Sequence, residues 1–171
     1  MDDRVINSNI ISQLLASLYM LKNCIDLCPI TEWNEKHNDY PFSQVVFHTL
    51  FDCDYNLCDT ELEFKEQYFH KANTTIFDDY EELEASKAIK VYGKIFINEY
   101  YDHCRIKTIA TIEIETFRNM LESNSDVRKN MTKLERYLNS IRHIQHHAAQ
   151  LGLRLQFITG KEMDWISRGT E

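Results

Sequence analysis

Three histidines lie within five positions of the segment RHIQHHAAQLGLRL, residues 142–155, which otherwise has the spacing of an amphipathic helix. His143 and His147 are four residues apart, so on a helix their side chains project from adjacent turns of one face and could bind one metal ion together. The third histidine points to another side. The stripe beside the apolar face continues with Gln150 and Arg154. Spacing alone leaves two interpretations open, a metal site and the solvated side of a helix.

Other metal chemistry does not fit the pattern. A zincin helix carries Glu directly after its first histidine, and Ile144 occupies that position here. A di-iron bundle needs Glu-x-x-His on two helices, and the sequence contains no such pair. A site made of histidines alone therefore needs a further ligand from another element.

His48 is the best candidate for that further ligand. It lies in a predicted helix, residues 41–59, on a polar stripe beside the apolar face, and the stripe comprises Gln44, His48, Asp52 and Tyr55. Three imidazoles leave coordination positions open for water or substrate, as in catalytic zinc sites. Asp52, one turn after His48, is a candidate catalytic residue that could orient the imidazole or a water. The alternative for this i,i+4 pair is a surface contact.

Four long helical patterns would position these side chains. Apolar residues recur at three- and four-residue spacing over 9–28, 41–59, from about 80 onward, and 130–157. The predicted core face of the third pattern comprises Ile89, Tyr92, Phe96, His103 or Cys104, Ile106 and Ile109. Thr132 and Glu135 form the pattern of a capping box, and Gly160 marks the end of the last helix. The fold class predicted is therefore all-α, with a four-helix bundle as the default architecture.

Two segments between these patterns are less regular. Residues 60–79 are charged and aromatic with weak periodicity, which predicts a long loop with one or two helical turns. This loop could cover a site, or it could equally be a surface connection with His70 exposed. Residues 108–117 alternate with the period of a strand, which leaves the end of the third helix open by several residues.

Size, charge and cysteine content restrict the function. The 171 residues are enough for one core, so we expect a single domain over 1–171. The net charge is −8 and the 19 basic residues are scattered, so no nucleic acid partner is expected. The chain contains no apolar run of membrane-spanning length and no signal-peptide pattern, and its five cysteines form no CxxC pair. We expect a cytoplasmic protein with no membrane contact and with reduced thiols.

Two segments resemble a known family, the DinB-like proteins, a damage-inducible group that shares a fold with bacillithiol and mycothiol transferases. HIQHHAAQ, residues 143–150, resembles the H-x-x-H-H-x-G-Q signature on the last helix of that family, with Ala149 in place of the usual Gly. VVFHTLFDCDYNL, residues 45–57, is similar to the segment of the second helix that supplies the first histidine. The closing DWISRG is also similar.

The resemblance implies a site and an architecture. By it, His48, His143 and His147 correspond to three ligands of a divalent metal, usually zinc or nickel, at the mouth of a four-helix bundle. It also implies an up-down-down-up topology and a homodimer.

Two classes of function remain. The first is a divalent-metal-dependent enzyme that acts on a small-molecule substrate, either a thiol S-transferase with a low-molecular-weight thiol or a hydrolase. The second is a non-catalytic dimeric bundle, acting in binding or the stress response, whose metal is structural or vestigial. The chain has no basic groove, so the family's association with DNA damage is not carried over.

Overall fold

The computed structural model describes residues 2–36, 40–70, 91–123, 127–128 and 130–170. The described chain is all-helical and contains no strand, as the sequence predicts. It forms six helices: α1 (Asp3–Leu27), α2 (Phe42–Asn56), α3 (Glu61–Lys65), α4 (Lys94–Glu113), α5 (Phe117–Met120) and α6 (Lys133–Thr159). Within the described ranges, none of these helices combines the length and apolar character needed to cross a bilayer.

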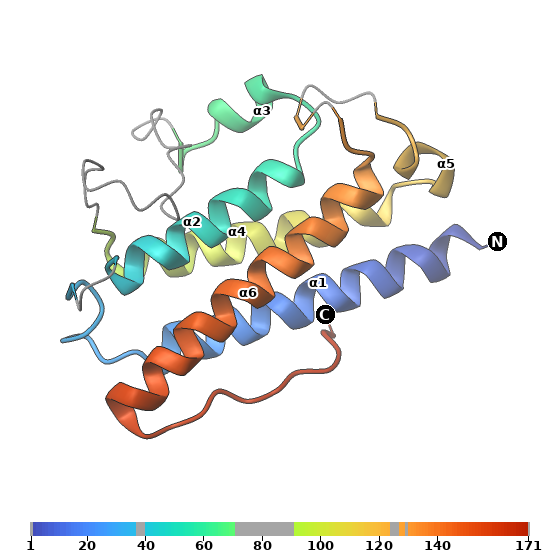
Figure 1. Ribbon diagram of the computed structural model, residues 1–171. Coiled ribbons are helices and arrows are strands. Elements are labelled where there is room, and N and C mark those ends of the chain that lie inside the picture. The colour runs from blue at the N-terminus through green and yellow to red at the C-terminus, as the bar shows by residue number, and fades with distance from the viewer. Residues whose placement is uncertain (1, 37–39, 71–90, 124–126, 129, 171) are drawn as a thin grey trace.

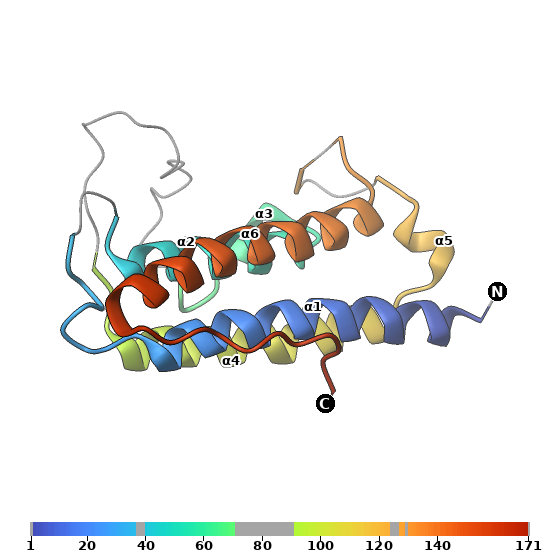
Figure 2. The same ribbon diagram turned by 60° about the horizontal axis from the view of Figure 1, so that its bottom comes forward.

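The four long helices pack against one another in two layers. Figure 2 shows α1 and α4 side by side in one layer, with α2 and α6 in the other. Contacts join α1 to α4 and α6, and α2 to α4 and α6, so each long helix touches two neighbours. α1 and α6 run in one direction, whereas α2 and α4 run in the opposite direction (Figure 1). The arrangement places α2 in contact with α6.

The apolar faces expected for α1 and α2 form the core. On α1, Leu14, Leu18 and Leu21 are fully buried, and on α2 Val46 and Leu50 are fully buried as well. These residues recur at three- and four-residue spacing, so each helix presents one continuous apolar stripe to the interior.

The face predicted for the third helix is partly wrong. Ile106, expected in the core, is 58 % exposed. The buried face of α4 instead comprises Ile97, Tyr100, Tyr101, Cys104, Thr108 and Ile112. Thr108 is accommodated there because its hydroxyl donates to the carbonyl of Cys104 within the helix. The strand-like alternation over 108–117 is resolved as the last turns of α4 followed by a short connection to α5.

The predicted helix ends are confirmed on α6. The Thr132 hydroxyl accepts from the Glu135 amide while the Glu135 carboxylate accepts from the Thr132 amide, which is a complete capping box. Gly160 ends the helix with φ of 68°, a left-handed conformation that favours glycine. Within the predicted loop 60–79, α3 supplies one short helix, and the positions from 71 onward lie outside the described residues.

The segment after α6 turns back and runs alongside α1 (Figure 2). The Gly169 amide donates to the Ser12 carbonyl at 2.9 Å, and the Tyr19 hydroxyl donates to the Thr170 carbonyl at 2.6 Å. A Cβ at Gly169 would lie only 2.3 Å from the Leu15 Cβ, so the close approach to α1 requires glycine.

Candidate metal centre

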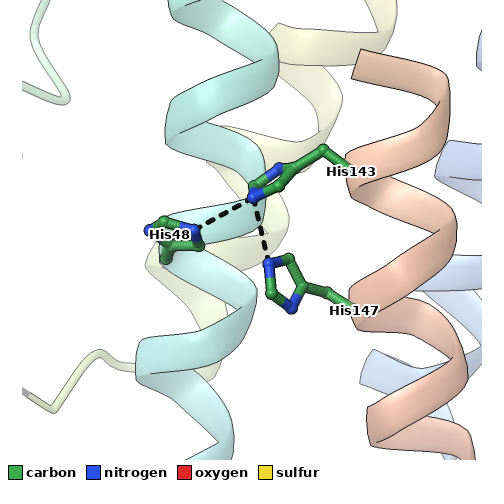
Figure 3. A group of neighbouring side chains, drawn as sticks. All are labelled: His48, His143 and His147. Atoms are coloured by element: carbon green, nitrogen blue, oxygen red, sulfur yellow. Dashed lines mark hydrogen bonds between the residues drawn. The ribbon is translucent and has the colours of Figure 1, made fainter. Parts of the chain in front are cut away.

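The three histidines singled out in the sequence come together between α2 and α6. His48 projects from α2 and meets His143 and His147, which project from adjacent turns of α6 (Figure 3). The Nε2 atom of His143 lies 3.1 Å from that of His48 and 3.0 Å from that of His147. The ligand atoms of all three lie within 4.8 Å of one another. His146 is exposed and is not a member of the group.

The burial of the cluster excludes the interpretation of a solvated helix side. His147 is fully buried, and His48 and His143 are half-buried. Burial, followed by the neighbouring His143 and His147, lowers the pKa of His48 to about 2. Burial and His143 likewise lower the pKa of His147 to about 3. Both imidazoles are therefore neutral at physiological pH, which is the state that binds metal.

A hydrogen bond at the far side of the His147 ring fixes which of its nitrogens faces the cluster. His147 Nδ1 donates to Oε1 of Gln150 at 2.8 Å. A neutral imidazole protonated at Nδ1 carries its lone pair on Nε2, and Nε2 is the atom that faces His143. On His143, Nδ1 lies 3.4 Å from the Asp52 carboxylate, close enough for an electrostatic contact. The His147 ring thus directs its acceptor nitrogen toward His143.

Asp52 occupies a different position from the one expected. The sequence suggests that it orients His48, one turn earlier on α2, whereas the structure places its carboxylate beside His143 across the helix interface. Asp52 is only 7 % exposed, and Asn56 Nδ2 donates to its Oδ2 at 2.9 Å. The simple surface contact considered as its alternative is excluded by this burial.

Arg128 also contacts Asp52, and no pattern in the sequence identifies it as part of the site. One terminal nitrogen of its guanidinium pairs with Asp52 Oδ1, and its Nε donates to the Asn56 Oδ1 at 2.9 Å. The guanidinium carbon lies 5.9 Å from the centre of the Tyr55 ring. Arg128 lies between α5 and α6 in the sequence, and no periodicity connects it with α2.

The donor set fits a divalent transition metal. Zinc–imidazole bonds of about 2.0–2.1 Å require ligand nitrogens roughly 3 Å apart, which agrees with the separations of the Nε2 atoms. The second nitrogen of a metal-binding histidine ordinarily donates to a carboxylate or carbonyl oxygen, as Gln150 and Asp52 provide here. The cluster could therefore hold a metal ion through three imidazoles.

A second polar cluster is buried on the opposite side of α2. Asp54, fully buried, accepts from His70 Nε2 at 2.8 Å, from Lys107 Nζ at 2.8 Å and from the Tyr100 hydroxyl at 3.2 Å. Burial raises the pKa of Asp54, but its bonds to His103, His70 and Lys107 outweigh this and hold the pKa well below its usual range. His70, for which a surface position was considered, is only 2 % exposed.

The Asp54 cluster is best explained as a structural link. Its carboxylate is saturated by donors from α4 and from the segment after α3, and the Lys107 ammonium occupies the place that a metal cation would need.

Comparisons with known proteins do not assign the chain to a family. No family model matches the sequence, and no curated protein or solved structure shows significant similarity to it. The resemblance to the DinB-like proteins therefore stays a prediction from the residues that carry it.

Proposed function

We propose that this chain is a divalent-metal-dependent enzyme of the DinB-like type that acts on a small molecule, by thiol transfer or by hydrolysis. The observation that carries the proposal is the convergence of His48, His143 and His147 Nε2 atoms from two helices, with the Nδ1 atoms of the α6 pair turned toward Gln150 and Asp52. In a purely solvent-facing stripe the rings would be exposed to water, and no protein acceptor would fix a tautomer as Gln150 does for His147.

The chain's own residues hold and orient the site. His48, His143 and His147 would bind the ion, and three protein ligands leave coordination positions open. When bound, a divalent ion supplies Lewis acidity and lowers the pKa of a thiol or a water to near neutrality. Asp52 is the candidate catalytic residue predicted from the sequence. Its carboxylate lies 3.4 Å from His143 Nδ1, where it can stabilise a proton on that nitrogen.

Further parts of the proposal rest on the resemblance. The directions of the four long helices, with α1 and α6 opposite to α2 and α4, agree with a four-helix bundle of up-down-down-up topology. Zinc or nickel is the proposed metal, a low-molecular-weight thiol the proposed cosubstrate for transfer, and a cytoplasmic homodimer the proposed form of the protein. The acidic charge supports a small-molecule substrate over nucleic acid.

The first test is metal content. We expect near-stoichiometric zinc or nickel in the tag-free wild type by plasma mass spectrometry, and loss of that metal in His48→Ala, His143→Ala and His147→Ala. His146→Ala is the matched control, because His146 is an exposed neighbour on α6 and should leave the metal content unchanged. A wild type that takes up no metal after incubation with either ion would sink the proposal.

The second test separates the two chemistries and the non-catalytic alternative. In the cobalt-loaded protein, a bound thiolate gives an intense sulfur-to-metal absorption band, so titration with cysteine reports thiol binding directly. Thiol binding favours S-transfer, and ester or amide cleavage without it favours hydrolysis. A metal-loaded protein with neither property would be the dimeric binding protein considered as the alternative. In that case the His48→Ala variant should retain the function of the wild type.

A further inference from the structure

Arg128 places a positive charge next to the three-histidine cluster. Its guanidinium pairs with Asp52, and the Asp52 carboxylate lies 3.4 Å from His143 Nδ1. The guanidinium is therefore connected to His143 of α6 through Asp52 of α2, although Arg128 belongs to neither helix.

Only part of the guanidinium's hydrogen-bonding capacity is used. Arg128 Nε donates to Asn56, and one terminal nitrogen donates to Asp52. Among the described residues, no acceptor bonds to the remaining terminal nitrogen, and the side chain is 35 % exposed. A guanidinium offers five N–H groups in a planar fork, so one edge of Arg128 can still bind an oxyanion from solution.

The backbone of Arg128 is held in an unusual conformation. Its φ is 47°, the one positive value at a non-glycine residue within the described parts of the chain. Residues that have a Cβ adopt this left-handed backbone conformation at an energetic cost. Such strain is often found where a residue is positioned for function. The side chain of Arg128, held on this backbone, contacts Asp52 and Asn56.

The charge balance of the site favours an anion. Asp52 and Arg128 compensate each other, and the three proposed ligands are imidazoles, which bind metal in their neutral state. A divalent ion held by three neutral ligands would keep its full charge, so the open coordination positions and the guanidinium would attract the same negatively charged group.

We infer that Arg128 is a substrate-recognition residue that binds a carboxylate or phosphate group of the substrate beside the three-histidine centre. The inference rests on the proposed function, since it places the substrate at that centre. It narrows the substrate class to small oxyanion-bearing molecules, and, for the thiol-transfer chemistry, to thiols that carry such a group.

Anion binding to the cobalt-loaded protein tests this inference without any turnover. The cobalt content of each variant is measured first, and acetate and inorganic phosphate are then titrated separately while the visible spectrum of the metal is followed. Arg128→Gln should weaken binding of at least one anion tenfold or more, about the loss of one charge-assisted bond. Arg128→Lys should restore part of the affinity, because Lys keeps the charge but not the fork.

The matched control is Arg118→Gln, the same charge change on α5 at a side chain that is 90 % exposed, and it should bind both anions as the wild type does. Whichever anion responds to Arg128→Gln identifies the group recognised. Unchanged affinity for both anions in a fully metal-loaded Arg128→Gln variant would overturn the inference while leaving the proposed function intact. Absence of metal from the wild type would overturn both.

Asp52→Asn provides a second route should Arg128→Gln lose its metal. Removing the carboxylate that competes for the guanidinium should strengthen binding of acetate or phosphate, measured at saturating cobalt. Affinities for both anions that are equal to or weaker than those of the wild type would contradict the inference.

Discussion

At the scale of single residues, the histidines are held in the protonation state that metal ligands require. In the metal-free protein, burial keeps His48 and His147 neutral far below the ordinary histidine pKa of about 6.5. The packing of the helices thus holds these two ligands in the neutral form before any ion binds. Because only the folded state imposes this form, the stability of the protein depends on pH.

That dependence has a definite sign. Between about pH 6.5 and the lowered pKa values of about 2 and 3, His48 and His147 bind protons in the unfolded chain but not in the folded one. The metal-free protein should therefore lose stability as the pH falls from 7 to 5, by up to roughly 2 kcal/mol for each histidine. Above pH 7 both states are neutral at these positions, and their contribution to the pH dependence disappears.

Urea denaturation of the metal-free protein at several pH values measures this effect. The double variant His48→Gln/His147→Gln serves as the reference, because it retains every other titrating group. The stability of the wild type should fall more steeply on acidification than that of the double variant. Parallel curves would show that the two histidines are not held neutral by the fold.

At the scale of helices, Asp54 links α2 to α4 through a buried ion pair. Lys107 Nζ lies 2.8 Å from Asp54 Oδ1, and the lysine side chain is only 14 % exposed. This pair, with His70 and Tyr100 as further donors, fixes the rotation of α2 about its axis. The rotation decides whether His48, six residues earlier, points toward α6.

We expect Asp54→Asn to lower the free energy of unfolding by about 3 kcal/mol, because it leaves the Lys107 ammonium buried without its counter-charge. Replacing both residues, as Asp54→Asn/Lys107→Met, should recover part of that loss. The control Asp26→Asn removes a carboxylate that is 57 % exposed and pairs with Lys22 one turn away, so it should cost less than about 1 kcal/mol. Equal losses in the two single variants, measured by urea denaturation, would contradict a linking role for Asp54.

At the scale of the whole molecule, the C-terminal segment closes the fold by packing on α1. Gly169 is buried against Leu15, and backbone bonds join the segment to Ser12. Met163 of the same segment also lies against Gly152 on α6, so the segment contacts both α1 and α6.

Gly169→Ala should displace this segment and lower the free energy of unfolding by about 1–3 kcal/mol, since its Cβ would overlap the backbone and side chain of Leu15. Arg168→Ala is the control, because the neighbouring side chain is exposed and its loss leaves the backbone contacts in place. Urea denaturation compares the two, and limited proteolysis reports whether the segment has detached. A Gly169→Ala variant as stable as Arg168→Ala would show that the segment adds nothing to the fold.

The sequence by itself determined the helices and the candidate ligands. The periodicity of apolar residues predicted α1, α2 and α6, and the capping box and Gly160 predicted the ends of α6, because these signals are local. The spacing of His143 and His147 identified one ligand pair for the same reason, and the polar stripe on α2 identified His48. The buried face of α4 was less clear, since apolar residues lie on more than one side of that helix.

Only the tertiary structure decided what surrounds these ligands. Asp52 faces His143 rather than His48, Arg128 reaches it from a loop 76 positions away, and Asp54 is enclosed by groups from α4 and the segment after α3. The packing of α2 against α6 and α4 fixes each of these contacts, and no repeat or spacing in the sequence records which helices become neighbours. Local physics therefore specified the ligands, and helix packing specified the charges and hydrogen bonds that make them a site.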